Sequence, residues 1–194
     1  MQRIKGSRWG MTKGQLYILR RRYPAVADFF LGITLPDEFA AEVENWRKRF
    51  AAPKTAPHIT LIPPFSWSGT DQDLEEVISK SLEGISPFEI RAEGIGRFGR
   101  RVIYIDVELS QELLRVYQRV AAGLESRGVA LEDRPYKPHI TLATRLSPGE
   151  FSVYMEELGD YAPSETFPCQ QVALFKMRVD GRKRQWQVIR QIAF

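Results

Sequence analysis

The five-residue string Pro-His-Ile-Thr-Leu occurs twice in this chain, at residues 57–61 and again at residues 138–142. The chain has only two histidines, His58 and His139, and each lies in one of these strings. Successive side chains of a β-strand point to opposite faces, so each string predicts a strand with its histidine and threonine on one face. A proline is tolerated at the start of such a strand. We therefore expect a fold built around two matched strands.

The repeated polar side chains suit acid–base chemistry at phosphorus. Histidine has an unperturbed pKa of about 6.5, so a neutral and a protonated imidazole can act as base and acid near neutral pH. The hydroxyls of Thr60 and Thr141 can donate hydrogen bonds to phosphate oxygens. We therefore name His58, His139, Thr60 and Thr141 as candidate catalytic residues. Such a pair predicts a bell-shaped rate profile centred between about pH 6 and 8.

Two other interpretations of the repeat compete with catalysis. A purely structural repeat usually keeps its apolar positions and varies its polar ones, whereas here both kinds are kept. A metal site would need more ligands than two histidines and one cysteine, which stand without the close spacings typical of zinc sites. Carboxylates would have to complete such a site. We therefore expect neither a metal nor a cofactor.

Composition limits the class of protein. The 194 residues are 43% hydrophobic and 27% charged, which is ordinary for one globular domain. The single cysteine, Cys169, excludes an internal disulfide and fits a reducing compartment. The longest apolar stretch, near residues 29–35, is too short to span a membrane, and no secretory signal is recognisable. We expect a cytoplasmic monomer without membrane contact.

The positive charge is concentrated at the beginning of the chain. The net charge is +4, and residues 1–23 contain seven basic residues and no acidic one. We therefore predict a basic extension over residues 1–23, more simply a solvated tail than an RNA contact. Residues 24–194 are predicted to form one domain of two approximate halves, 24–98 and 99–194.

Both halves predict strands and helices in β-α-β-α-β order. For the first half we expect strands, helices and one loop as follows: strand 26–35, helix 36–50, the His58 strand, loop 63–69, helix 71–82 and strand 87–95. For the second half we expect the following: strand 101–109, a helix capped by Ser110 and ending near 126, the His139 strand, a short helix opened by a Ser147–Glu150 capping box, and a closing hairpin of 166–178 and 184–192.

The two His-x-Thr motifs in similar halves resemble those of the 2H phosphoesterase superfamily. Within it, the chain is most similar to the 2′-5′ RNA ligase-like proteins, which include RNA 2′,3′-cyclic phosphodiesterases. The flanking strings APHITLIPPF and YKPHITLAT fit the family's motif contexts, and the resemblance runs from about Val26 to the C-terminus. It implies an α+β fold of two pseudo-symmetric lobes around a central cleft. Each lobe would be a largely antiparallel sheet with helices outside.

The resemblance also implies a reaction. A phosphodiesterase of this family opens 2′,3′-cyclic phosphates on RNA ends or small nucleotides to 2′-phosphates, without a metal. By family pattern His58 would be the general acid for the leaving 3′-oxygen, and His139 the general base for water. The alternatives are a 2′-5′ phosphodiester hydrolase or ligase-like activity on the same residues, and a non-catalytic module that binds RNA or nucleotides.

Four further residues are candidate substrate contacts. Phe65 could stack on a base, or could merely pack the loop after the first motif. Tyr136 and Lys137 directly precede the second motif. Arg145 comes one residue later than the arginine that often follows the second motif in RNA cyclic phosphodiesterases. The basic string at residues 97–101 is most simply a solvated turn, with RNA contact as the weaker option.

Overall fold

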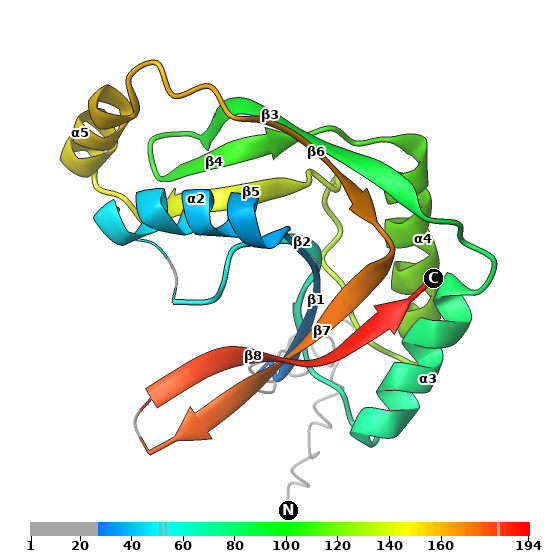
Figure 1. Cartoon of the computed structure of the whole chain (residues 1–194). Helices are drawn as coiled ribbons and strands as arrows, with labels where there is room; N and C mark the ends of the chain where they lie inside the picture. The colour runs from blue at the N-terminus through cyan, green and yellow to red at the C-terminus, as the bar shows by residue number, and fades with distance from the viewer. Residues whose placement is uncertain (1–26, 51, 53, 182) are drawn as a thin grey trace, which may run out of the picture.

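A computed structural model describes residues 27–50, 52, 54–181 and 183–194 (Figure 1). The predicted basic extension, residues 1–23, lies outside the described residues. The described chain forms one antiparallel sheet of eight strands in the order β6-β3-β4-β5-β2-β1-β7-β8. The strands are β1 (Phe29–Thr34), β2 (His58–Phe65), β3 (Phe88–Phe98), β4 (Val102–Val107), β5 (His139–Thr144), β6 (Ser164–Cys169), β7 (Gln171–Asp180) and β8 (Lys183–Ala193). The helices are α2 (Asp37–Arg49), α3 (Asp71–Leu82), α4 (Gln111–Glu125) and α5 (Pro148–Leu158).

The sheet consists of two four-stranded halves that meet at the two motif strands. β2 and β5 share a single residue pair, Ile59 with Ile140, whereas every other pair of neighbouring strands is joined by several. We call β2, β1, β7 and β8 the His58 half, and β5, β4, β3 and β6 the His139 half. The predicted α+β fold with two antiparallel lobes is therefore confirmed.

Strands cross between the halves of the chain as they enter the sheet. β3 precedes residue 99 but pairs with β4, and β7 returns from the C-terminal part to pair with β1. The helices cross in a similar way, because α2 follows β1 yet contacts β5, while α4 precedes β5 yet contacts β2. These exchanges join both halves into one continuous hydrophobic core.

The motif strands bury one face and leave the other open. Ile59, Leu61, Ile140 and Leu142 are fully buried in the core. The histidine and threonine of each motif are half-buried and alternate with these residues along the strand. This confirms the predicted alternation of faces.

Hydrogen bonds of side chains fix where three helices begin. The Ser110 hydroxyl accepts from the backbone N–H of Leu113 at 3.1 Å and so starts α4. The predicted capping box of α5 is present, with the Ser147 hydroxyl and the Glu150 carboxylate each binding the backbone of the other. Thr70 and Asp73 form a second capping box at the start of α3. Such caps satisfy N–H groups that the helix itself leaves unpaired.

Two predicted boundaries were wrong. The predicted loop 63–69 begins too early, because β2 continues to Phe65 through a bulge where Ile62 pairs with Leu31. Pro63 and Pro64 are tolerated there because β2 no longer pairs with β5 at this end. The predicted strand 166–178 is two strands, because β6 pairs with β3 before Gln170 and β7 pairs with β1 after it.

Candidate active site

The register of β2 and β5 brings the four catalytic candidates together. Ile59 lies opposite Ile140 in an antiparallel pair, so His58 lies beside Thr141 and Thr60 beside His139. All four side chains are half-buried on the open face of the sheet. Each imidazole therefore lies next to the hydroxyl of the other motif.

Both imidazoles are held in the same way by the backbone two residues earlier. Nδ1 of His58 lies 2.7 Å from the Ala56 carbonyl oxygen, and Nδ1 of His139 lies 2.8 Å from that of Lys137. A carbonyl oxygen can only accept, so Nδ1 carries the proton in each ring. Nε2 is then the nitrogen that remains for chemistry, accepting a proton when the ring is neutral and donating one when it is charged.

His58 lies in an apolar environment. Its ring centroid is 4.9 Å from that of Phe30 and 5.3 Å from that of Phe175. Gly32 makes room for this packing, because a Cβ there would lie 3.4 Å from the imidazole and 3.3 Å from Phe175. The pKa of His58 is lowered to about 4, mainly by burial and also by the positive charges of Arg47 and His139, although the hydrogen bond that the ring donates to the Ala56 carbonyl raises it.

Arg47 supports the segment that leads into His58. It is buried in the last turn of α2, and its Nη2 donates to the Thr55 carbonyl oxygen at 2.6 Å. Glu44 lies 3.6 Å from its Nη1. Because the Ala56 carbonyl holds the His58 ring, a fixed Thr55 carbonyl also helps to orient that ring. The sequence shows Arg47 only as one of several basic residues at the end of a helix, so sequence analysis missed it.

His139 has more polar neighbours. Its ring centroid lies 5.0 Å from those of Tyr104 and Phe98, and Asp106 lies directly opposite it in the β4–β5 pair. Burial lowers the pKa of His139, and the charges of Arg134 and Lys137 act in the same direction, while Asp106 and the hydrogen bond to the Lys137 carbonyl raise it. A carboxylate therefore favours the charged form of this histidine.

Lys137 and Tyr104 form a polar contact beside His139. The Lys137 ammonium lies 5.4 Å from the centre of the Tyr104 ring and 4.0 Å from Oδ2 of Asp106. A hydrogen bond with the Tyr104 hydroxyl raises the pKa of Lys137, so the ammonium stays charged. Tyr104 fits only because Gly96 lies under its ring, where any side chain would collide with it. Tyr104 is not among the site residues predicted from the sequence.

A pocket of about 320 Å³ adjoins Thr60 and His139. It is lined by Pro63 and Pro64 of β2, Phe98 of β3, Tyr117 of α4, and Leu131, Glu132, Arg134, Pro135, Tyr136 and Lys137 of the segment before β5. This volume falls in the range of small-molecule sites. Two of the predicted substrate contacts, Tyr136 and Lys137, line it. Tyr136 stacks on Tyr117 with centroids 4.3 Å apart, and its hydroxyl donates to the Thr60 carbonyl oxygen at 3.2 Å.

The structure does not bring the other two predicted contacts to the pocket. Phe65 lies in the core, 4% exposed and packed against Phe29, because β2 continues to this residue and the alternation that begins at Ile59 and Leu61 places it on the buried face. Arg145 is exposed just beyond β5. The rise of a β-strand places its Cα about 20 Å from that of His139. Neither residue lines this pocket, and a role of either in substrate binding stays a prediction.

The described residues offer little to a metal. Within residues 27–50, 52, 54–181 and 183–194, no group of three or more His, Cys, Asp or Glu side chains could hold one. Cys169 is buried, and burial raises the pKa of its thiol to about 12, so it carries no charge at neutral pH. No helix in the described part of the chain is long and apolar enough to cross a membrane.

The chain is similar to curated bacterial proteins. The RNA 2′,3′-cyclic phosphodiesterase of Bacillus subtilis strain 168 is 27% identical over 135 residues, which cover 60% of this chain and 70% of that protein. The protein of the same name from Geobacillus stearothermophilus is 28% identical over 133 residues, covering 63% of this chain and 41% of that protein. The chain therefore spans less than half of the latter relative's length.

Solved structures share the fold. Escherichia coli LigT complexed with 3′-AMP matches with a TM-score of 0.66 at 17% identity, over 87% of this chain and 98% of that one. A protein of Thermus thermophilus matches with a TM-score of 0.62 at 22% identity, over 86% of this chain and 97% of that one. A family model described as the 2′-5′ RNA ligase superfamily matches residues 35–181. The chain therefore belongs to the 2′-5′ RNA ligase superfamily, as the 2H phosphoesterase resemblance of its two motifs predicts.

Proposed function

We propose that this protein is a phosphodiesterase that opens 2′,3′-cyclic phosphates on RNA ends or nucleotides to 2′-phosphates, by histidine acid–base catalysis without a metal. The observation that carries the proposal is the matched pair of imidazoles. Each is held through Nδ1 by a backbone carbonyl, and each lies beside the threonine of the other motif. The names of the similar Bacillus and Geobacillus proteins support the same reaction.

The proposed reaction uses the two histidines on opposite sides of phosphorus. Nε2 of His139 takes a proton from water as its oxygen attacks phosphorus. The bond from phosphorus to the 3′-oxygen breaks, and Nε2 of His58 gives its proton to that oxygen. Thr60 and Thr141 donate hydrogen bonds to the non-bridging oxygens, where negative charge builds up. The phosphate remains on the 2′-oxygen, and the proton gained by His139 later replaces the one lost by His58.

The order in which the histidines take up a proton bears on these roles. In the free protein burial lowers the pKa of both rings, that of His58 to about 4, while Asp106 favours the charged form of His139 alone. These neighbours favour a proton on His139 over one on His58 before substrate binds. For His58 to act as the acid, the negative phosphate must raise its pKa once the phosphate lies between the two rings. The assignment of His58 as acid follows the family pattern and needs a direct test.

A substrate screen tests the proposed function. Purified protein is incubated with EDTA and, separately, with nucleoside 2′,3′-cyclic phosphates, RNA that ends in a cyclic phosphate, and 2′-5′-linked oligonucleotides. We expect turnover of the cyclic phosphates, with phosphorus NMR showing only 2′-phosphate product. Turnover restricted to 2′-5′ linkages would favour the related hydrolase. Binding of nucleotides without any turnover would favour the non-catalytic module, and rescue by one divalent ion would contradict the metal-free mechanism.

A further inference from the structure

β7 and β8 extend beyond the rest of the sheet as a two-stranded hairpin. β1 pairs with β7 only as far as Lys176. Beyond that residue the two strands pair with each other, from Met177 opposite Trp186 to Asp180 opposite Lys183. In Figure 1 this end of the hairpin projects at the lower left, clear of the helices. The part of β7 and β8 beyond Lys176 does not cover the core, which leaves the function of this projecting end to be explained.

One face of the hairpin is continuous with the open face that carries His58. Phe175 stacks on Phe30 with centroids 4.1 Å apart, and Trp186 meets the same ring edge-on at 4.9 Å. Phe30 in turn lies 4.9 Å from His58. We call Phe30, Phe175 and Trp186 the aromatic column. It leads from the catalytic candidate to the base of the hairpin.

The same face continues outward past the aromatic column. Residues that pair directly across an antiparallel ladder lie on one face, so Met177 shares the face of Trp186, and Val179 that of Arg184. Met177 and Trp186 are half-buried, whereas Val179 is 61% exposed and Arg184 is exposed. This face thus offers flat, partly accessible apolar surface followed by a cation.

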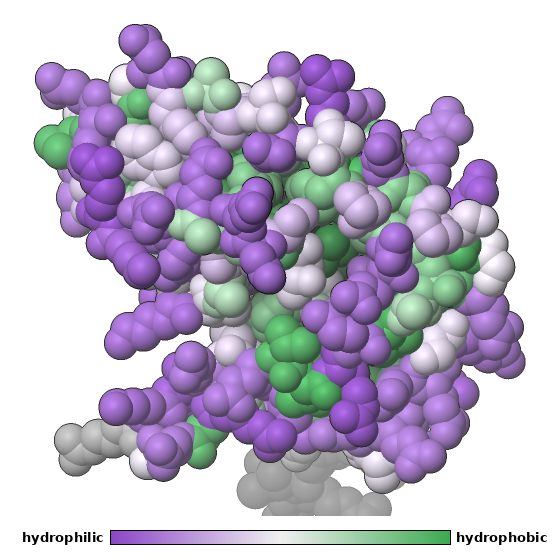
Figure 2. Space-filling model, viewed as in Figure 1, coloured by the Kyte–Doolittle hydropathy of each residue, from purple (hydrophilic) through white to green (hydrophobic). Residues whose placement is uncertain are grey.

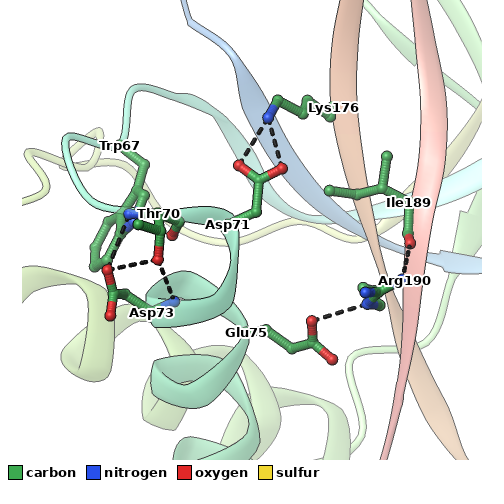
Figure 3. A network of polar contacts seen from close by, with 8 residues as sticks. All are labelled: Trp67, Thr70, Asp71, Asp73, Glu75, Lys176, Ile189 and Arg190. Carbon is green, nitrogen blue, oxygen red and sulfur yellow. Dashed lines mark hydrogen bonds and ion pairs between the residues drawn. The ribbon is translucent and has the colours of Figure 1, made fainter.

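The hairpin is strongly basic. Residues 176–190 contain six basic residues and one acidic residue. Two of the basic residues are neutralised by α3, since Lys176 lies 2.6 Å from Asp71 and Arg190 lies 2.9 Å from Glu75 (Figure 3). Lys183 and Arg184, near the end of the hairpin, form no comparable ion pair with the described residues of α3. Hydrophilic residues cover most of the projecting end in Figure 2.

We propose that this hairpin binds the single-stranded RNA that precedes the terminal cyclic phosphate, which makes RNA ends rather than mononucleotides the preferred substrate. Proteins that bind single strands combine basic side chains for the phosphates with aromatic side chains on which bases stack. Here Arg184 supplies positive charge on the same face as Trp186, Lys183 adds to it from the opposite face of the strand, and Trp186 supplies the stacking surface. The inference rests on the proposed function, because it assumes that a cyclic phosphate lies between the histidines.

The dimensions of the sheet agree with this assignment. The pocket of about 320 Å³ beside His139 has room for little more than one nucleoside. β5 and β7 are separated by β2 and β1, and three strand spacings amount to about 14 Å. An oligonucleotide of about ten residues is therefore long enough to reach from the pocket to the hairpin, since stacked nucleotides rise about 3.4 Å each.

The test compares two substrates on the same protein. We measure kcat/KM for a nucleoside 2′,3′-cyclic phosphate and for a ten-nucleotide RNA with a cyclic phosphate at its end, at several salt concentrations. The variants are Trp186→Ala and the double variant Lys183→Glu with Arg184→Glu. The matched control reverses two exposed arginines of α4, as Arg115→Glu with Arg119→Glu.

We expect the wild-type protein to prefer the oligonucleotide. We define the preference ratio as kcat/KM for the oligonucleotide divided by kcat/KM for the nucleoside cyclic phosphate. Trp186→Ala should lower this ratio roughly tenfold, as the loss of one stacked base predicts. The double glutamate variant should lower the ratio and make the salt dependence for the oligonucleotide shallower by about 0.7 for each phosphate that is no longer bound. The α4 variant should keep the wild-type ratio. Because Lys183 and Arg184 are exposed, their substitution tests the proposal even if Trp186→Ala fails to fold.

Three results would overturn the inference in distinguishable ways. If the wild-type protein hydrolyses the mononucleotide and every variant keeps the same ratio, the hairpin does not bind RNA while the proposed function stands. If the wild-type protein turns over neither substrate, the proposed function fails and the inference fails with it. A double-stranded DNA that competes as strongly as single-stranded RNA would also contradict it, because the hairpin would then be a general polyanion site.

Discussion

His58 and His139 occupy the same five-residue string, yet the strands beside them supply different neighbours. β1 places Thr34 opposite His58, where β4 places Asp106 opposite His139. The His58 ring packs against two phenylalanines that stack on each other, and the charge of buried Arg47 acts on it, whereas the His139 ring lies beside a carboxylate, a lysine and a tyrosine. The sequence repeat thus sets equal local geometry, and the neighbouring strands set unequal electrostatics.

This difference teaches that a duplicated motif need not give duplicated chemistry. An acid and a base must hold different protonation states at one pH. The unequal neighbours make the two rings differ in pKa, but in the free protein they favour the proton on His139, so the proposed roles require the bound phosphate to raise the pKa of His58. Variants that alter one half of the site at a time can show how far the two halves differ.

The largest effect should come from removing either imidazole. His58→Ala and His139→Ala should each lower kcat by about 10²- to 10⁴-fold, the usual contribution of a general acid or base. The double variant should lose less than the product of the two, because paired groups act as a unit. Circular dichroism checks that each variant is folded. Near-normal turnover in either single variant would contradict the proposal that the two histidines act together as acid and base.

Loss of one threonine hydroxyl should cost about 10²-fold in the chemical step, as for other donors to a developing oxyanion. Thr60→Val and Thr141→Val remove the hydroxyl but keep the shape of the side chain. Serine at the same position should restore most of the rate. Single-turnover kinetics separate this effect from binding, and a valine variant altered only in KM would assign the hydroxyl to substrate binding instead.

The burial of His58 should make folding stability depend on pH. Its pKa is about 4 in the folded protein and near 6.5 in the unfolded chain, so the unfolded state binds the proton first. The free energy of unfolding should therefore fall as pH drops from about 6.5 to about 4, by roughly 3 kcal/mol in total. Urea titrations should show this fall removed in His58→Asn. His139→Asn should remove less of it, and equal effects would mean that both rings are equally buried.

The smallest effect should come from Asp106. Its negative charge raises the pKa of His139, so Asp106→Asn should move the limb of the kcat/KM profile that belongs to His139 to lower pH. Thr34→Val, at the equivalent position beside His58, removes no charge and should leave both limbs in place. Because burial lowers the pKa of both histidines, the wild-type maximum itself should lie below the range of about pH 6 to 8 that unperturbed values predict. A maximum within or above the range of about pH 6 to 8 would contradict the lowering of both pKa values by burial.

The sequence predicts those features that depend on local pattern. Alternation placed His58 and Thr60 on the open face, and the Ser147–Glu150 spacing located the start of a helix. Phe65 was predicted to lie in a loop because Pro63 and Pro64 are typical of a strand end, but β2 continues through them and its alternation puts Phe65 on the buried face. Residues 166–178 were predicted to form one strand because no change in composition marks the point, at Gln170, where the pairing partner changes from β3 to β1.

The electrostatics of the site could not be predicted because they depend on which residues the folded sheet places side by side. Asp106 is separated from His139 by a whole helix in the chain, and only the pairing of β4 with β5 brings them together. Arg47 reaches the segment before His58 from the end of α2. The anchoring of each Nδ1 by a carbonyl two residues earlier is the exception, because it follows from a spacing that both motifs share.

The central claim is that the two histidines have different roles, with His58 as acid and His139 as base. The direct test is a cyclic substrate whose 3′-oxygen is replaced by sulfur, since a thiolate leaves without needing a proton at neutral pH. On this substrate we predict that His58→Ala recovers most of the activity that it loses on the natural ester, while His139→Ala remains impaired. Recovery of His139→Ala instead would mean that His139 is the acid and His58 the base. Equal behaviour of both variants would contradict the claim that the two histidines have different roles.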